Sequence, residues 1–181
     1  MNHIAALPLR DLPDWLEAEL RSDHAGETGA VLIYRGILAL SRDAAVRDFA
    51  ARHMTTEEGH LRLIEQVLPP ARRSALLPIW RVAGWFTGAL PALFGPRAVF
   101  ATIDAVESFV DHHYQQQIDR LDAERSHPAL RAMLARCQEE EVHHRDEARA
   151  LGDSPPGLVL RAWVAMVDAG SKAAVAAAKR F

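Results

Sequence analysis

The pattern Glu-x-x-His occurs four times in this chain of 181 residues, although with its nine histidines fewer than one occurrence is expected by chance. Residues three apart in an α-helix lie on one face, so each occurrence places a carboxylate beside an imidazole. The four pairs are Glu57/His60, Glu124/His127, Glu140/His143 and Glu141/His144. The second pair spans a helix break before Pro128, and the last two overlap and cannot face the same way. Two credible pairs therefore remain, on two different helices.

A single glutamate precedes each pair at a similar distance, so the two halves of the chain resemble an internal repeat. Glu27 lies 30 residues before Glu57, and Glu107 lies 33 residues before Glu140. Glu27 and Glu107 have small or apolar neighbours at helical spacing, and a carboxylate that faces a core is costly unless it is paired or bound to a metal. Ferritin-like bundles with two iron or manganese ions use one Glu from each of two helices and a Glu-x-x-His from each of the other two. The sequence therefore predicts a two-metal site for iron or manganese, although zinc also fits these ligand types.

The whole chain shows helical patterns, without the two-residue alternation of strands. We expect helices over about 14–41, 43–68, 96–124, 128–151 and 158–181. Residues 152–157, which include two prolines, indicate a linker. The predicted fold class is all-α, with a single domain over residues 1–181. We expect a ferritin-like four-helix bundle with a long apolar crossover. An extra apolar helix is expected at the C-terminus, over residues 158–181.

The first predicted helix contains three glycines, Gly26, Gly29 and Gly36. Each glycine inside a helix costs roughly 1 kcal/mol relative to alanine. Three of them indicate that something packs very close to this helix. Two explanations remain open, a neighbouring helix or a crowded site beside Glu27.

Fifteen uncharged residues lie between Arg81 and Arg97. This stretch is shorter than the about 20 apolar residues of a membrane-spanning helix, and glycines and prolines interrupt it. Arginines border it, and Trp80 and Trp85 lie nearby, which is typical of a segment in a membrane interface. A buried crossover between helices is the alternative.

Composition excludes several classes of protein. A net charge of −3 gives no general attraction for nucleic acid. The one cysteine, Cys137, rules out an internal disulfide and any site built from several cysteines. No glycine-rich nucleotide fingerprint is present, so electrons for a redox reaction must come from outside. The first 15 residues have the pattern of neither a secretory signal nor a transit peptide.

Several sequence blocks resemble one known family. They are DHAGE over 23–27, EEGHL over 57–61, LPIWRVAGWFTGAL over 77–90, ESFVDHHY over 107–114 and EEEVHHRDEA over 139–148. These blocks are similar to the demethoxyubiquinone hydroxylases, which are ferritin-like di-iron monooxygenases of ubiquinone biosynthesis. The resemblance covers roughly residues 20–180. The chain has no organelle-targeting extension of the kind that metazoan members carry, so we expect a bacterial form.

The resemblance implies six metal ligands: Glu27, Glu57, His60, Glu107, Glu140 and His143. It favours Glu140 over Glu141, because the first histidine of the His143-His144 pair aligns with the ligand of the family. Glu57 and Glu140 are then the expected bridging carboxylates.

Four further residues are candidates for supporting roles. Asp111 and Asp146 lie one turn from expected ligands, where either can orient a ligand imidazole or form a surface salt bridge. His113 and Tyr114 belong to the HHY stretch of the family. We expect a path for protons or electrons there, with simple packing as the alternative.

The resemblance implies an enzyme that uses O₂ to hydroxylate the ring of a polyprenylated demethoxyubiquinol, giving demethylubiquinol. Its cofactors would be two iron ions per chain, with NADH, acting through a quinone, as the external two-electron reductant. Expected partners are the substrate, the membrane surface, other enzymes of ubiquinone biosynthesis and a second copy of the chain, but no nucleic acid.

A polyprenyl quinone resides in the bilayer, so the enzyme must reach it there. We therefore predict that residues 76–95 and the last helix form an apolar membrane-facing surface. The protein would be attached peripherally to the cytoplasmic side of a bacterial inner membrane.

Two other functions remain open. A ferritin- or catalase-like protein uses the same ligands for iron storage or peroxide disposal. A non-catalytic lipid-binding scaffold of a biosynthetic complex would not need the ligands at all.

Overall fold

A computed structural model describes residues 12–152 and 157–181, and over these residues the chain is helical without any strand. The elements are α1 (Asp14–Leu40), α2 (Ala44–Val67), the short 3₁₀ helix η2 (Pro70–Arg72), α3 (Leu77–Ala92), α4 (Pro96–Glu124), α5 (Pro128–Leu151) and α6 (Leu158–Ala178). The predicted all-α class is confirmed. Most of the predicted linker over 152–157 lies outside the described residues.

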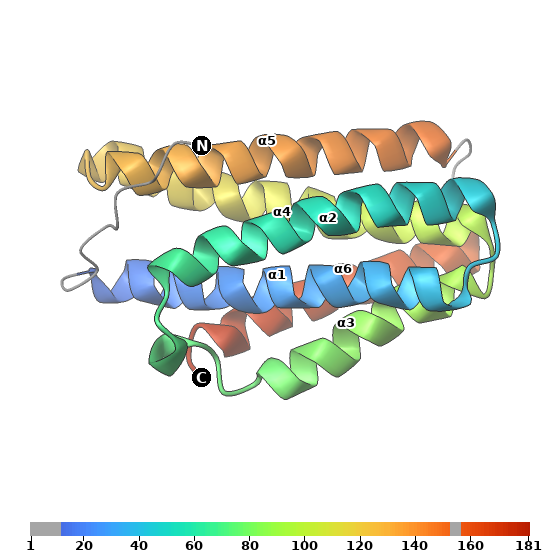
Figure 1. Cartoon of the computed structure of the whole chain (residues 1–181), viewed down its shortest axis with the longest axis horizontal. Coiled ribbons are helices and arrows are strands. Elements are labelled where there is room, and N and C mark those ends of the chain that lie inside the picture. The colour runs from blue at the N-terminus through green and yellow to red at the C-terminus, as the bar shows by residue number, and fades with distance from the viewer. Residues whose placement is uncertain (1–11, 153–156) are drawn as a thin grey trace.

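Helices α1, α2, α4 and α5 form the four-helix bundle (Figure 1). Turns of three residues join α1 to α2 and α4 to α5, so each of these pairs runs antiparallel. Asp43 ends the first turn, and its side chain accepts a hydrogen bond from Val46 N at 3.0 Å. In the second turn Arg125 and His127 have φ of 47° and 46°, before a proline opens α5.

The crossover from α2 to α4 contains η2 and α3. Helix α3 packs mainly on α1, and α6 packs on α4 and α1, so both cover the face that α1 and α4 present (Figure 1). The indole Nε1 of Trp163 on α6 donates a hydrogen bond to Thr102 Oγ1 on α4 at 2.8 Å. Helices α2 and α5 form the opposite face of the bundle.

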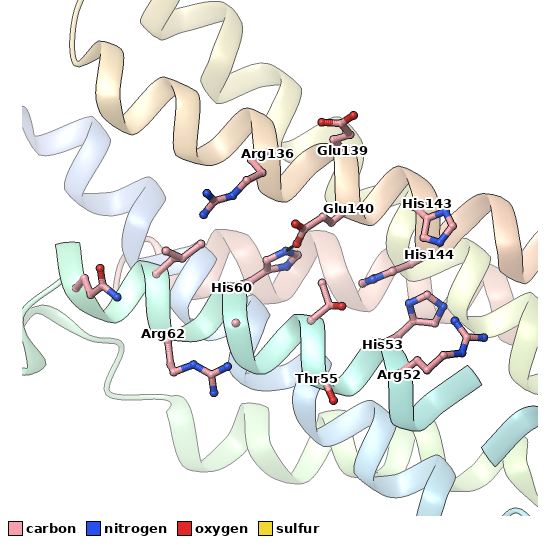
Figure 2. A pocket seen from close by; sticks show the side chains of 14 residues that line it. Arg52, His53, Thr55, His60, Arg62, Arg136, Glu139, Glu140, His143 and His144 are labelled. Carbon is pink, nitrogen blue, oxygen red and sulfur yellow. Dashed lines mark hydrogen bonds and ion pairs between the residues drawn. The ribbon is translucent and has the colours of Figure 1, made fainter. Parts of the chain in front are cut away.

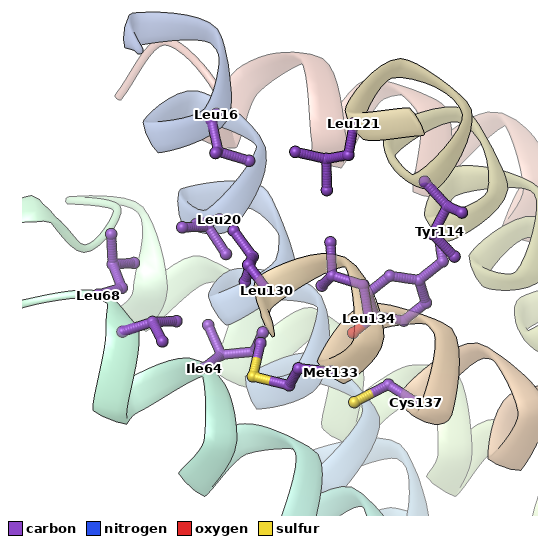
Figure 3. Packing of buried hydrophobic residues seen from close by; sticks show 12 residues of the cluster. Leu16, Leu20, Ile64, Leu68, Tyr114, Leu121, Leu130, Met133, Leu134 and Cys137 are labelled. Atoms are coloured by element: carbon purple, nitrogen blue, oxygen red, sulfur yellow. The ribbon is translucent and has the colours of Figure 1, made fainter. Parts of the chain in front are cut away.

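Apolar side chains fill the bundle in two clusters, one toward each end. The first cluster contains Leu16, Leu20, Ile64, Leu121 and Leu134 (Figure 3). The second contains Ile33, Ile37, Phe49, Phe100 and Ile103. On each bundle helix, the stretch between the two clusters carries the glutamates and histidines that the sequence singles out. A polar layer therefore lies between two apolar ones.

Helices α1 and α3 touch backbone to backbone at glycines. A Cβ added to Gly88 would lie 1.9 Å from the carbonyl oxygen of Ile33, and one on Gly84 would lie 2.5 Å from that of Gly29. On α1, a Cβ on Gly36 would meet the α3 backbone at 2.2 Å. Only glycine allows this approach.

The three glycines of α1 differ in their surroundings, so the two explanations, a neighbouring helix or a crowded site, can be compared at each. For Gly36 the neighbouring helix is the cause. A Cβ at Gly26 or Gly29 would meet nothing within 4 Å, and both residues line a cavity beside Glu27. That part of the site is therefore open rather than crowded.

Candidate metal centre

Four glutamates and two histidines meet in the polar middle layer of the bundle. They are Glu27 from α1, Glu57 and His60 from α2, Glu107 from α4, and Glu141 and His144 from α5. Each is at most 4% exposed. The i, i+3 spacing on α2 and α5 directs both side chains of each pair to the bundle axis. The two apolar clusters close this layer off toward the two ends of the bundle.

The potential ligand atoms form two overlapping groups, in each of which all atoms lie within 4.8 Å of one another. The first group comes from Glu27, Glu57, His60 and Glu141, and the second comes from Glu57, Glu107, Glu141 and His144. Glu57 and Glu141 belong to both groups, whereas Glu27 and Glu107 belong to one each. The arrangement offers two adjacent cation positions with two carboxylates between them.

Many atoms of this cluster are buried without a hydrogen-bond partner. They are Glu27 Oε2, Glu57 Oε1, His60 Nδ1, both carboxylate oxygens of Glu141, and His144 Nδ1. His60 Nδ1 lies 2.9 Å from Glu141 Oε1, and His144 Nδ1 lies 3.0 Å from Glu57 Oε1, yet neither contact has hydrogen-bond geometry. An unsatisfied buried polar group costs about 1–3 kcal/mol. Cations bound by the same atoms would remove that cost, so the residues fit a metal centre.

The pKa values of the cluster reflect burial and crowding of charge. Burial raises the pKa of Glu27 and of Glu107, and neighbouring carboxylates add to the effect. Burial also disfavours the charged form of Glu57, but the nearby imidazoles of His144 and His60 outweigh it and bring its pKa to about 2. The pKa of His144 rises to about 9, because Glu141 and Glu57 outweigh its burial. Imidazoles and carboxylates thus favour each other's charged forms here, and metal ions bound by deprotonated ligands can supply the same balance of charge.

Both tyrosines of the chain bind carboxylates of the cluster. Tyr34 Oη on α1 donates a hydrogen bond to Glu107 Oε1 on α4 at 3.0 Å, and Tyr114 Oη on α4 donates one to Glu27 Oε1 on α1. Each tyrosine follows the glutamate of its own helix by seven residues, or two turns, and holds the glutamate of the other. This role of Tyr34 is not among the predictions from the sequence, although the repeated seven-residue spacing is a signal for it.

The structure contradicts the predicted orientation of Glu140 and His143. Their side chains are 44% and 72% exposed, whereas those of Glu141 and His144 are 1% and 2% exposed. A step of one residue turns a helical side chain by about 100°, so only one of the overlapping pairs can face the axis. Figure 2 shows Glu140 reaching from α5 toward His60 and His143 further along α5. Glu141, and not Glu140, is therefore the residue of α5 that belongs to both ligand groups.

Asp111 and Asp146 contact arginine rather than an imidazole. Both pair with Arg145, and Asp111 also accepts a hydrogen bond from Gln138 Nε2 at 2.8 Å. Among the described residues neither aspartate hydrogen-bonds a histidine of the cluster. Both aspartates therefore form salt bridges, and a supporting role for either beside a metal ligand stays a prediction.

His113 lies beside the cluster rather than in it. Its Nε2 is 3.2 Å from both Ser22 Oγ and Asp23 Oδ1, and its ring stacks on Phe109. It lines the same cavity as Tyr114. The predicted proton or electron path through His113 and Tyr114 stays a prediction.

Two openings of different character reach the cluster. A cavity of about 380 Å³ between α1, α3, α4 and α6 is largely apolar, and its wall includes Glu27, Glu107, Phe109, Trp80 and Trp163. On the opposite side, a polar groove of about 1070 Å³ lies between α2 and α5 (Figure 2). Its lining includes Arg52, Thr56, His60, Arg136 and Glu140.

A four-helix bundle with such paired carboxylate and histidine groups in its core defines the class of ferritin-like carboxylate proteins. Within that class the chain belongs to the family of ubiquinone biosynthesis protein COQ7, whose profile matches residues 14–178. The family resemblance predicted from the sequence is confirmed.

Named relatives agree with this assignment. The chain is 37% identical to the 3-demethoxyubiquinol 3-hydroxylase of Rhodospirillum rubrum, over 89% of this chain and 76% of the relative. It is 32% identical to the mitochondrial NADPH-dependent 3-demethoxyubiquinone 3-hydroxylase of Rattus norvegicus, over 90% and 76%. The 3-demethoxyubiquinol 3-hydroxylase of Ralstonia pickettii is 32% identical, over 74% of this chain and 61% of the relative. These names bear out the predicted class of enzyme, a hydroxylase of ubiquinone biosynthesis.

Proposed function

We propose that this chain is an O₂-dependent 3-demethoxyubiquinol 3-hydroxylase whose cluster holds two iron ions. The observation that carries the proposal is the pair of overlapping ligand groups that share Glu57 and Glu141 and adjoin an apolar cavity. When bound, the two iron ions would activate O₂ for hydroxylation of the substrate ring. Several relatives are named as NADPH-dependent, so a reduced nicotinamide, acting directly or through a quinone, is the proposed electron source.

The proposed ligands are Glu27, Glu57, His60, Glu107, Glu141 and His144. Glu57 and Glu141 would bridge the two ions, because each belongs to both groups. Glu27 with His60, and Glu107 with His144, would complete one ion each. Tyr34 and Tyr114 hold the two non-bridging carboxylates in place.

The apolar cavity is the proposed site of the substrate. Its wall carries aromatic side chains, including Phe109 and Trp163, that suit a quinol ring, and its inner end is formed by glutamates of the cluster. His113, with Ser22 and Asp23, adds a polar group to this wall. A volume of about 380 Å³ suits a ring with the start of its tail. The rest of a polyprenyl tail would extend toward α3 and α6, which also line the cavity.

Helices α3 and α6, which both line this cavity, also expose large apolar side chains. They are Ile79, Val82, Phe86 and Leu90 on α3, Leu93 and Phe94 just after it, and Leu158, Val159 and Met166 on α6. The α3 residues recur every three or four positions and so share one face. Arg81 and Arg161 are exposed on the same helices, where cations attract anionic lipid. We propose that this surface docks on the cytoplasmic side of a bacterial inner membrane.

No helix of the described segments is long and apolar enough to cross a membrane, in line with the expectation for the stretch between Arg81 and Arg97. The test of docking is sedimentation with vesicles of phosphatidylethanolamine and phosphatidylglycerol. Phe94→Glu should reduce binding, because Phe94 is 80% exposed at the end of α3. Gln66→Glu adds the same charge in the groove between α2 and α5 and should not. Equal binding by both variants and the wild type would argue against the surface.

The adjacent histidines of α5 give a matched test of the function. His144→Ala should lose iron after anaerobic reconstitution, whereas His143→Ala should keep two ions per chain. In a bacterium that lacks its own hydroxylase, His143→Ala should restore ubiquinone and His144→Ala should let demethoxyubiquinone accumulate.

Three other outcomes of these experiments would contradict the proposed function or the ligand assignment. Two ions per chain without any change in the quinone pool would favour storage or peroxide disposal. Complementation by His144→Ala would favour a non-catalytic scaffold. Wild-type protein without stoichiometric metal would contradict the ligand assignment itself.

A further inference from the structure

Glu140 contacts the side of His60 that faces away from the cluster. Its Oε2 lies 2.6 Å from His60 Nε2, within hydrogen-bond distance. The other ring nitrogen, Nδ1, lies 2.9 Å from Glu141 Oε1 and 3.7 Å from oxygens of Glu27 and Glu57. The imidazole thus spans from the buried cluster to the polar groove.

The position of Glu140 follows from its place directly before Glu141. Because one residue turns the side chain by about 100°, Glu140 leaves the core and enters the groove between α2 and α5. The outer edge of His60 borders the same groove, where Figure 2 shows the two side chains meeting. A carboxylate is only an acceptor, so this contact keeps a proton on Nε2 and leaves the lone pair of a singly protonated ring on Nδ1.

We propose that Glu140 is a positioning residue that fixes the ring of His60 so that Nδ1 points at the metal position shared with Glu27. This inference rests on the proposed metal centre. A carboxylate bonded to the outer nitrogen of a ligand imidazole sets its tautomer and rotation and raises its basicity. Loss of such a partner typically weakens metal binding by about 10–100-fold.

The two proposed metal positions differ in whether a carboxylate holds the outer nitrogen of their histidine. The residue that corresponds to Glu140 on α2, directly before Glu57, is Thr56. In the described part of the chain no hydrogen bond joins Thr56 to His144. The ring of His144 instead lies against that of His53, with centroids 4.0 Å apart. Removal of Glu140 should therefore weaken one of the two ions, the one bound by His60.

A surface salt bridge would predict a different result. Glu140 is 44% exposed, and an exposed ion pair adds only about 0–1 kcal/mol to stability. If the contact were only that, its removal would leave metal binding unchanged. Metal affinity for each position, rather than stability or turnover, separates the two roles.

The experiment is an anaerobic titration of the full chain with Co²⁺, followed by its visible absorption and by competition with a chelator. Glu140→Ala should weaken one of two sites by about 10–100-fold and change the Co²⁺ spectrum. Glu140→Gln keeps an acceptor oxygen and should fall between Glu140→Ala and the wild type. Glu139→Ala removes the same charge from a neighbouring groove residue and should match the wild type.

Each outcome decides between the proposals. If Glu140→Ala equals Glu139→Ala in affinity and spectrum, or weakens both sites equally, the positioning role is wrong while the metal centre stands. If the wild type binds no pair of ions, the metal centre fails and the positioning role fails with it. Thermal unfolding of each variant without metal shows whether a loss of affinity comes from a loss of fold.

Discussion

At the scale of single residues, the two tyrosines stabilise the carboxylates that belong to only one ligand group. Burial and nearby carboxylates raise the pKa of both phenols, so they remain protonated donors. Tyr34 and Tyr114 are also fully packed in the two apolar clusters. The ring of each tyrosine therefore packs in one apolar cluster, while its hydroxyl reaches a carboxylate of the polar layer.

Tyr34→Phe tests this link because it removes one hydroxyl and keeps the ring. Glu107 Oε1 then loses its donor in a buried site, so the free energy of unfolding should fall by about 1–3 kcal/mol in the metal-free protein. Urea unfolding measures the change, and Tyr114→Phe should give a similar loss through Glu27. Unchanged stability in both variants would contradict the assigned hydrogen bonds, and unchanged turnover of Tyr114→Phe would discard the path through that residue.

The correct register of α5 was also present in the sequence. Leu130, Leu134 and Cys137 recur at helical spacing, and continuing the same stripe leads to Glu141, His144 and then Ala148. The family resemblance favours the other pair, Glu140 and His143, because it aligns the first of the two adjacent histidines with the ligand of the family. The apolar stripe states which face of the helix is buried, so it is the stronger physical evidence. The other four predicted ligands had no overlapping competitor, and the structure brings all four into the cluster.

At the scale of elements, the contact between α1 and α3 explains why the crossover is helical. Glycine and proline lower the expectation of a helix, and the sequence indicates only a broken apolar segment there. The structure shows a continuous helix over Leu77–Ala92, with Pro91 in its last turn. Glycines at the α1 contact let the two backbones meet, and that packing offsets their poor helix propensity. Such compensation comes from another helix and cannot be seen in the local sequence.

Gly88→Ala and Gly26→Ala form a matched pair for this contact. The new methyl at Gly88 would lie 1.9 Å from the Ile33 carbonyl oxygen, so overpacking should cost about 1–3 kcal/mol despite better helix propensity. The methyl at Gly26 meets nothing within 4 Å and should stabilise the helix by up to about 1 kcal/mol. Chemical denaturation of both variants measures whether each substitution lowers or raises the free energy of unfolding. A stabilising Gly88→Ala would show that α3 does not pack on α1 as closely as described.

At the scale of the whole molecule, the cluster lies between an apolar cavity and a polar groove. Helices α3 and α6 line the cavity and also carry the proposed membrane surface, so the proposed route of a lipid substrate to Glu27 and Glu107 lies on their side of the bundle. The groove reaches His60 and His144 from the side of α2 and α5. This arrangement separates an apolar route from a polar one, and both end at the same buried charges.

Because of those buried charges, we expect the stability of the whole bundle to depend on the proposed metal ions. Without a cation, buried atoms of Glu57, Glu141 and His144 lack partners, and their cost lowers the stability of the folded state. Metal ions that bind only the folded state add about 2.7 kcal/mol per site at 100 times the dissociation constant. Anaerobic addition of Fe²⁺ should therefore raise the melting temperature, and a chelator should reverse the rise. His144→Ala should lose most of it, while His143→Ala should retain it. A melting temperature that is independent of metal in the wild type would mean that protonated imidazoles alone satisfy the cluster.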